Sequence, residues 1–145
     1  MGTRYETDVI AWANEQAALL RAGQLDQLDI EHLADEIEDV GKSEKRELAS
    51  RMAVLIAHLL KWQFQPERRG SGWERAIHEQ RKSIVRQVEK SPSLKHYLAD
   101  GECIQEAWSD AVIIAISETN LDIFSDDCPW DSALILTPDF YPTAS

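Results

Sequence analysis

The sequence has few of the features that would place a protein in a membrane or outside the cell. Its 145 residues include only two cysteines, Cys103 and Cys128, and a chain of this size forms a core without disulfide staples. The longest apolar run, residues 53–60, is broken by His58 and is shorter than the roughly 18 residues that a membrane span needs. The amino terminus carries no apolar segment typical of an export signal. These absences predict a cytoplasmic protein that does not bind a membrane.

Familiar catalytic and cofactor motifs are also missing. The sequence contains no glycine-rich phosphate loop, no nucleophile elbow and no serine or cysteine triad. The two cysteines do not have the spacing of a zinc site. No cofactor is therefore predicted.

Segments that alternate apolar and polar residues, as strands do, are nearly absent. Apolar residues instead recur at spacings of three and four, which is typical of helices. The predicted helices cover residues 7–22, 30–65, 73–90 and 102–120, with a short one after Ser91-Pro92. The apolar stripe keeps its phase across Gly41, which favours one continuous helix there over a break capped by Ser43.

The predicted core centres on the helix before Pro66. Its apolar stripe continues through both halves of that helix and consists of Ile30, Leu33, Ala34, Ile37, Val40, Leu48, Met52, Leu55, Ile56 and Leu59. The helix over residues 73–90 has an apolar face that includes Ile77, Ile84 and Val85. The tail after Leu121 has too many apolar residues to stay solvated. The sequence therefore predicts an all-α fold, a single-domain helical bundle over residues 1–145 with five to six helices and a strapped C-terminal tail.

The net charge of −11 is unevenly distributed along this acidic protein. Residues 1–60 contain twelve acids and six Lys or Arg, residues 61–95 contain four acids and nine Lys or Arg, and residues 96–145 contain ten acids and no Lys or Arg. Such blocks usually neutralise one another across packed helices, and the alternative is a basic patch that binds a polyanion or an acidic partner. The strongly negative total argues against nucleic-acid binding by the whole surface.

Two segments carry a family resemblance. The run from Tyr5 to Trp73, with HLLKWQFQPERR at residues 58–69, and the later CPW at residues 128–130 are similar to recurring motifs of one bacterial family. On these residues the chain resembles the family catalogued as domain of unknown function twenty-nine. The resemblance implies a compact all-helical fold, and it implies no activity and transfers no functional residue.

Arg51 and His58 form the first candidate site, with six residues between them on one helix. The spacing looks like the Arg-x6-His motif of a class of helical-bundle ribonucleases, in which arginine holds a phosphate and histidine moves a proton. A two-residue pattern also arises by chance, and a histidine beside a core stripe is often structural. These residues support an alternative function, a ribonuclease-like or nucleotide-binding enzyme.

A metal site is the second candidate. His32 and Glu36 lie four residues apart on one predicted helix face, and His58 and His78 lie on other helices that could converge. The paired Glu-x-x-His motifs of di-iron bundles are absent. No metal ligand is therefore predicted.

The third candidate is the basic aromatic turn, defined as residues 61–73. Its candidate binding residues are Lys61, Trp62, Arg68, Arg69 and Trp73. Such residues stack on and pair with acidic partners, although the tryptophans could also simply close the end of the bundle. The leading hypothesis is a protein-interaction module that uses this turn to bind an acidic protein or a second copy of itself.

Overall fold

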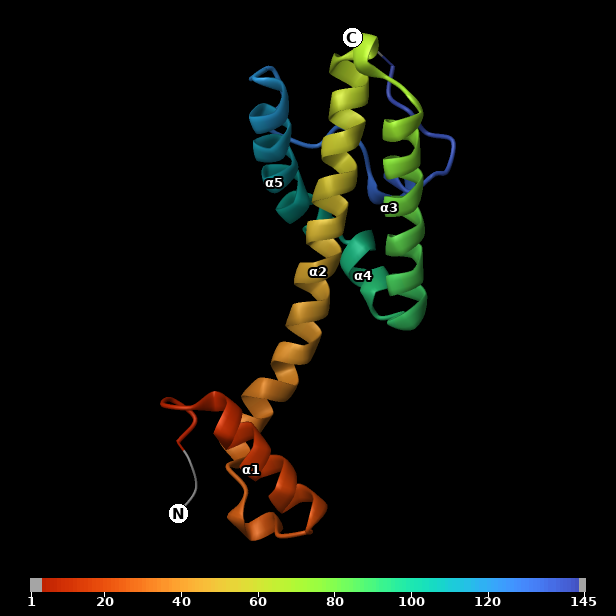
Figure 1. The fold of residues 1–145 in the computed structure, drawn as a ribbon. Helices are drawn as coiled ribbons and strands as arrows, with labels where there is room; N and C mark the ends of the chain where they lie inside the picture. The colour runs from red at the N-terminus through yellow and green to blue at the C-terminus, as the bar shows by residue number, and fades with distance from the viewer. Residues whose placement is uncertain (1–3, 144–145) are drawn as a thin grey trace. The chain divides into compact units, whose positions relative to one another are not determined.

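The structure, a computed structural model, describes residues 4–143 and is all-α over that range, which confirms the predicted fold class (Figure 1). No β-strand occurs in these residues. The helices are α1 (Val9–Arg21), α2 (Ile30–Phe64), α3 (Ser71–Lys90), α4 (Leu94–Ala99), α5 (Glu102–Thr119) and α6 (Ser132–Ile135), with short 3-10 helices at Leu25–Gln27 and Pro66–Arg68. None of the helices in the described range has the length and apolar character that crossing a membrane requires.

Helix α2 is continuous through Gly41, as the unbroken phase of its apolar stripe predicts. It runs for 35 residues and ends at Phe64. Pro66 accounts for this end, because a proline disfavours the helical conformation in the residue before it. The predicted short helix starts later than expected, at Leu94, since Ser91 and Pro92 form a turn whose carbonyls accept bonds from the amides of Leu94 and Lys95.

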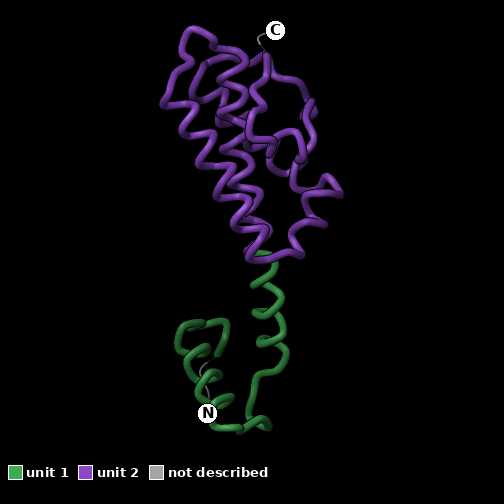
Figure 2. Tube along the Cα trace, turned by 90° about the vertical axis from the view of Figure 1, so that its right-hand side faces the viewer, with its two compact units in different colours: residues 1–43 green, residues 44–145 purple. Residues whose placement is uncertain are grey.

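The chain divides into two compact units (Figure 2). Residues 1–43 form the amino-terminal unit, with α1 and the first part of α2, and residues 44–145 form the carboxy-terminal unit, with the rest of the helices. The sequence predicts one domain over residues 1–145. The boundary between the two units falls within α2, so no linker marks it in the sequence.

The core of the carboxy-terminal unit is built on α2. The predicted core residues Leu48, Met52, Leu55, Ile56 and Leu59 are all fully buried, which confirms this part of the stripe. They pack with side chains from α3, α4, α5 and the tail, namely Ile77, Ile84, Leu94, Tyr97, Cys103, Ala107, Ala111, Ala115 and Ile135.

The C-terminal tail lies against this core as predicted. The Trp130 ring meets the rings of Trp108 and Phe140 edge to face, and the Phe124 ring meets Phe64 in the same way. Edge-to-face pairs of this kind stabilise packing beyond the area that they bury. The tail is therefore part of the fold of the carboxy-terminal unit.

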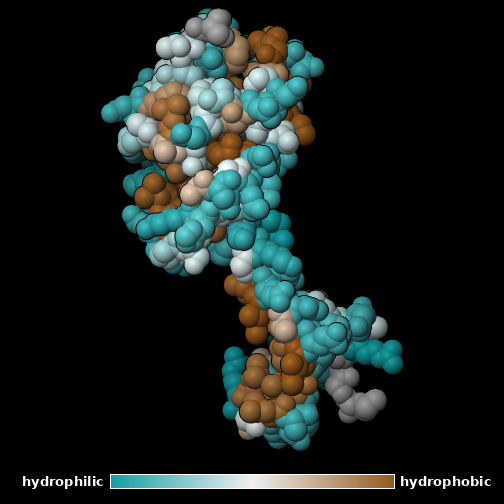
Figure 3. All heavy atoms as spheres, turned by 180° about the vertical axis from the view of Figure 1, so that it is seen from behind, coloured by the Kyte–Doolittle hydropathy of each residue, from teal (hydrophilic) through white to brown (hydrophobic). Residues whose placement is uncertain are grey.

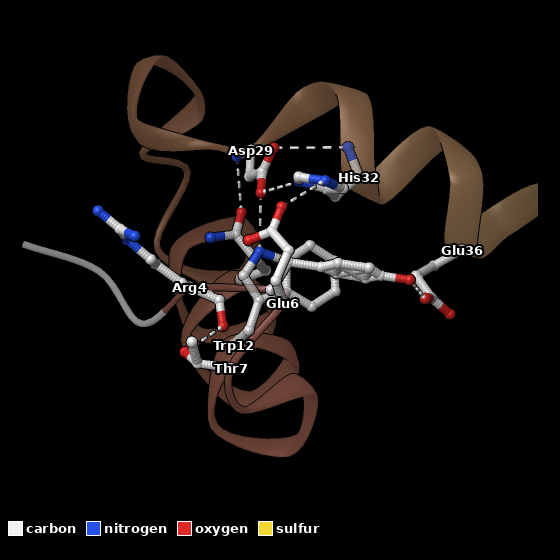
Figure 4. A network of polar contacts seen from close by, with 9 residues as sticks. Arg4, Glu6, Thr7, Trp12, Asp29, His32 and Glu36 are labelled. Carbon is white, nitrogen blue, oxygen red and sulfur yellow. Dashed lines mark hydrogen bonds and ion pairs between the residues drawn. The ribbon is translucent and has the colours of Figure 1, made fainter.

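Asp29 organises the amino-terminal unit (Figure 4). Its Oδ2 accepts hydrogen bonds from Trp12 Nε1 at 2.9 Å and from His32 Nδ1 at 2.7 Å. The backbone amide of Asp29 donates to Oε1 of the buried Gln16 at 2.8 Å. These bonds tie α1 to the start of α2. The hydrogen bond between the Asp29 carboxylate and the His32 ring lowers the pKa of Asp29 and raises the pKa of His32.

Tyr5 closes the other side of this network. Its ring stacks on the His32 ring with centroids 4.3 Å apart, and its hydroxyl donates a hydrogen bond to Glu36 (Figure 4). That hydrogen bond raises the pKa of Tyr5 to about 12. Glu6 Oε1 lies 3.4 Å from His32 Nε2. Both nitrogens of the imidazole therefore have an acidic neighbour within the unit.

Candidate interaction site

Lys61, the first residue of the basic aromatic turn, is engaged inside the carboxy-terminal unit. Its Nζ lies 2.6 Å from Glu118 Oε2 of α5 and 5.5 Å from the centroid of the Trp73 ring. The Lys61 side chain is only 12% exposed. It therefore joins the end of α2 to α5 and α3, which leaves it little freedom to bind a partner.

Arg69 and Trp62 close the end of the helix in the same way. Arg69 Nε donates to the Trp62 carbonyl oxygen at 2.6 Å, and its guanidinium lies over the Trp62 ring, 5.2 Å from the centroid. The Trp62 ring in turn packs on Tyr141 of the tail. A cation at these last carbonyls stabilises the C-terminal end of α2. Of the basic residues in the turn, only Arg68 is exposed.

Arg51 forms bonds between α2 and α3. Its Nη2 lies 2.6 Å from Glu47 Oε1, and its Nη1 donates to the Ser83 carbonyl at 3.4 Å and to Gln87 Oε1 at 3.3 Å. The buried Gln87 also donates to the backbone of Glu44 at 3.0 Å. The guanidinium therefore has partners that would have to be replaced before it could hold a phosphate.

His58 lies two helical turns beyond Arg51, roughly 10 Å along the axis. Its Nδ1 lies 2.9 Å from the carbonyl oxygen of Val54, so in the neutral ring Nδ1 carries the proton and Nε2 has the free lone pair. Among the described residues, no hydrogen bond or ion pair joins His58 to Arg51. The enzyme hypothesis stays a prediction.

The candidate metal ligands have other partners or lie on separate units. His32 pairs with Asp29 and Glu6, and Glu36 accepts from Tyr5. His58 and His78 belong to the carboxy-terminal unit. Within residues 4–143, no three or more His, Cys, Asp or Glu side chains are grouped in a way that could hold a metal ion.

The clearest recess with an apolar surface lies along α3. This α3 groove has a volume of about 370 Å³ and is lined by His78, Arg81, Lys82, Val85, Arg86, Glu89, Leu136 and Pro138. Val85, Leu136 and Pro138 give it an apolar floor, and the basic residues form most of its rim. No ion pair within residues 4–143 involves Lys82 or Arg86. Both cations are therefore free to meet an acidic partner.

Val85 corrects one sequence prediction. The periodicity places it on the core-facing side of its helix, but it is 44% exposed and forms part of the groove floor. Ile84 takes the buried position, and the next residue is turned by about 100° around the helix. The side of the groove that α3 forms has a signal in the sequence, because helical spacing puts His78, Lys82, Val85 and Glu89 on one face. Leu136 and Pro138 carry no such signal.

Arg81 holds the other side of the groove in place. It is only 5% exposed, and its guanidinium donates to three tail carbonyls, those of Ile135 at 2.9 Å, Pro138 at 2.9 Å and Phe140 at 2.6 Å. Burial lowers the pKa of Arg81, yet arginine stays charged in proteins. The guanidinium thus fixes Leu136 and Pro138 beside α3.

A second apolar surface lies on the amino-terminal unit. The α2 stripe, defined as Ile30, Leu33, Ile37 and Val40, was expected in the buried face, but Ile30 is 69% exposed, Ile37 70% and Val40 66%. Figure 3 shows apolar side chains gathered on this unit. Helical phase alone predicts the wrong burial here, because within the described residues 4–43 only α1 and a 3-10 turn are available to cover the stripe.

No curated protein and no solved structure gives a match. A family model described as "Domain of unknown function DUF29" matches residues 4–141, nearly the whole chain. The resemblance seen in the motifs at residues 58–69 and 128–130 is thereby confirmed, and this chain belongs to the DUF29 family.

Proposed function

We propose that this protein is a protein-interaction module that binds an acidic amphipathic helix in the α3 groove. The carrying observation is an exposed apolar floor at Val85, Leu136 and Pro138 beside the unpaired cations Lys82 and Arg86. An apolar strip with charge along one edge is the surface that receives the apolar face of a helix.

The shape of the α3 groove supports a helical partner. Its lining residues on α3 extend from His78 to Glu89, which is about 16 Å along the helix axis at 1.5 Å per residue. A volume of about 370 Å³ is at the low end of small-molecule pockets. An open recess of this length fits a rod of about three helical turns better than a compact ligand.

The charge of the α3 groove supports an acidic partner. Arg81, Lys82 and Arg86 line it, and Glu89 is its one acidic lining residue. Opposite charges at the edge of an interface speed association and select partners more than they add affinity. The net charge of −11 repels long polyanions from the rest of the surface. A short acidic segment is therefore preferred over nucleic acid.

The turn at residues 61–73 has a smaller part in this proposal. Lys61, Trp62 and Arg69 are held by internal contacts, while Arg68 remains exposed. We place the main binding surface on α3, within the same basic segment of the sequence.

A direct test uses a fluorescein-labelled synthetic peptide of leucine, alanine and glutamate that forms an acidic amphipathic helix. We expect saturable binding by fluorescence anisotropy, weakened about tenfold or more by the double substitution Lys82→Glu and Arg86→Glu. Lys95→Glu, at an exposed position on α4 outside the groove, is the matched control and should bind normally.

Two results would contradict the proposal. One is a peptide affinity that is equal for the wild type and the Lys82→Glu, Arg86→Glu variant. The other is binding of a labelled single-stranded oligonucleotide without binding of the acidic peptide, which would indicate a polyanion site.

A further inference from the structure

The α2 stripe is an apolar helix face that the described residues of the amino-terminal unit, 4–43, leave largely exposed. Its four residues fall within an arc of about 80°, given roughly 100° per residue. Three of them are at least 66% exposed. Exposed aliphatic side chains in a row at spacings of three and four are typical of a helix that docks on another surface.

The face of α2 opposite this stripe is acidic. Glu31 and Glu38 lie on that face by helical phase, about 120° to 140° around the helix from the centre of the stripe, and both are exposed. Neither forms an ion pair within the described part of the chain. Residues 1–43 as a whole contain ten Asp or Glu and three Lys or Arg. The stripe is therefore the apolar face of an acidic amphipathic helix.

The α2 stripe and the α3 groove match in length and in charge. From Ile30 to Val40 the stripe is about 15 Å long, close to the roughly 16 Å of the groove between His78 and Glu89. The helix that carries the stripe is acidic on its other face, and the groove has Lys82 and Arg86 at its rim. The chain thus contains both a basic apolar groove and a segment with the chemistry that the groove would select.

We propose that the occupant of the α3 groove is the α2 stripe of a second copy of this chain, an inference that rests on the function proposed above. The contact pairs two different surfaces, so each copy offers one groove and one stripe. Ile37 and Val40 lie on the floor formed by Val85, Leu136 and Pro138, and the net negative charge of residues 1–43 is attracted to the basic rim.

Pairing of two stripes with each other is disfavoured by charge. Such a contact would bring together two units that each carry ten acids and three bases, and like charges facing one another oppose association. Only the groove offers both an apolar floor and unpaired cations among the surfaces described above. The arrangement is therefore expected to be stripe to groove.

The first test measures the mass of the full-length chain by sedimentation equilibrium over a range of concentrations. We expect a reversible increase in mass with concentration. Ile37→Asp on the stripe, or Val85→Asp on the groove floor, should weaken association about tenfold or more. Ile113→Asp, at a 65% exposed position of α5, is the matched control and should associate like the wild type. Circular dichroism checks that each variant keeps its helices.

The second test exchanges the charges. Variant A carries Glu31→Lys and Glu38→Lys, and variant B carries Lys82→Glu and Arg86→Glu. Each variant alone gives the helix that carries the stripe and the groove charges of the same sign, and should associate more weakly than the wild type. An equimolar mixture restores opposite charges at both kinds of contact, so mixed complexes of A with B should form. This recovery requires direct contact between two copies, which a change in folding would not produce.

The outcomes separate this inference from the function on which it rests. A chain that stays monomeric but binds the acidic peptide in its α3 groove would overturn the inference and keep the function. Self-association that Ile37→Asp abolishes but variant B retains would show that the stripe binds elsewhere, which also overturns the inference. Failure of both peptide binding and self-association would overturn both proposals.

Discussion

Replacing Arg81 with methionine tests how the carboxy-terminal unit builds its groove. The guanidinium donates to three backbone carbonyls of the tail at 2.6 to 2.9 Å, and the side chain is almost fully buried. Methionine fills much of the same space but donates no hydrogen bond. It also leaves no buried charge behind, so the variant reports the loss of the bonds and not an unpaired ion.

The expected cost follows from the bond count. A hydrogen bond to a charged group contributes about 1.5–3 kcal/mol, so three would contribute about 4.5–9 kcal/mol. These values are already net of the cost of removing the groups from water, but the three bonds share one guanidinium, and bonds of one network do not add in full. We therefore expect Arg81→Met to reduce the free energy of unfolding by about 3 kcal/mol, a large part of the about 5–15 kcal/mol typical of a domain.

Urea unfolding followed by tryptophan fluorescence measures this change, since Trp62, Trp108 and Trp130 all belong to the carboxy-terminal unit. Arg81→Lys should fall between Arg81→Met and the wild type, because an ammonium cannot reach three carbonyls with the fork of a guanidinium. Lys82→Met, at the exposed neighbouring position, should change stability by less than about 0.5 kcal/mol. An Arg81→Met variant within about 0.5 kcal/mol of the wild type would refute the reasoning.

Three further predictions concern single features. Gly41→Ala should raise the midpoint of thermal unfolding by circular dichroism, because the new methyl group meets nothing within 4 Å and alanine favours a helix by about 1 kcal/mol; an unchanged or lower midpoint would count against a helical Gly41. Burial raises the pKa of Cys103 to about 12 and also raises the pKa of Cys128. A thiol reagent should therefore react slowly with both cysteines in the native protein at pH 8, and quickly with two thiols after unfolding in urea. Amide protection of α1 should be greatest between about pH 4 and 6.5. It should decline as the pH falls through the lowered pKa of Asp29 or rises through the raised pKa of His32, and equal protection from pH 3 to pH 9 would contradict a stabilising role of this pair.

The fold could be predicted from the sequence because its main signals are local. The spacing of Leu48, Met52, Leu55 and Leu59 identifies one helix face, and all four are fully buried. Pro66 marks the end of α2 within two residues. A helix depends on hydrogen bonds between near neighbours in the chain, so composition and periodicity are enough to locate it.

The contacts of the candidate sites could not be predicted in the same way, because they join distant parts of the chain. Lys61 pairs with Glu118, 57 residues away, and Arg81 binds carbonyls 54 to 59 residues away. The sequence places Lys61 and Arg69 among aromatic residues, and both cations do lie over tryptophan rings. Residue type alone, however, does not show whether the partner of a cation belongs to the same chain or to another molecule. The backbone carbonyls that Arg81 binds have no sequence signature at all.

The α2 stripe shows what helical phase can and cannot establish. The same periodicity runs from Ile30 to Leu59, yet Leu48 to Leu59 is core and Ile30, Ile37 and Val40 are exposed. Phase gives the direction in which side chains point, while burial depends on whether another element lies there. The carboxy-terminal unit supplies α3, α5 and the tail, and the described part of the amino-terminal unit supplies no comparable cover.

The exposure of this stripe also sets the strength of the association that we propose. Fully burying an aliphatic side chain contributes about 1.5–3 kcal/mol, so three that are about 70% exposed would contribute about 3–6 kcal/mol. Lost translational and rotational freedom alone costs about 4–15 kcal/mol. One such contact is therefore marginal by itself, and measurable self-association requires the additional attraction between the acidic amino-terminal unit and the basic rim. Salt should weaken that attraction, because screening shortens the range of exposed charges to about 8 Å at physiological ionic strength. Stripe-to-groove pairing thus predicts a mass that falls as salt rises, whereas an association driven by apolar contact alone would hold or strengthen.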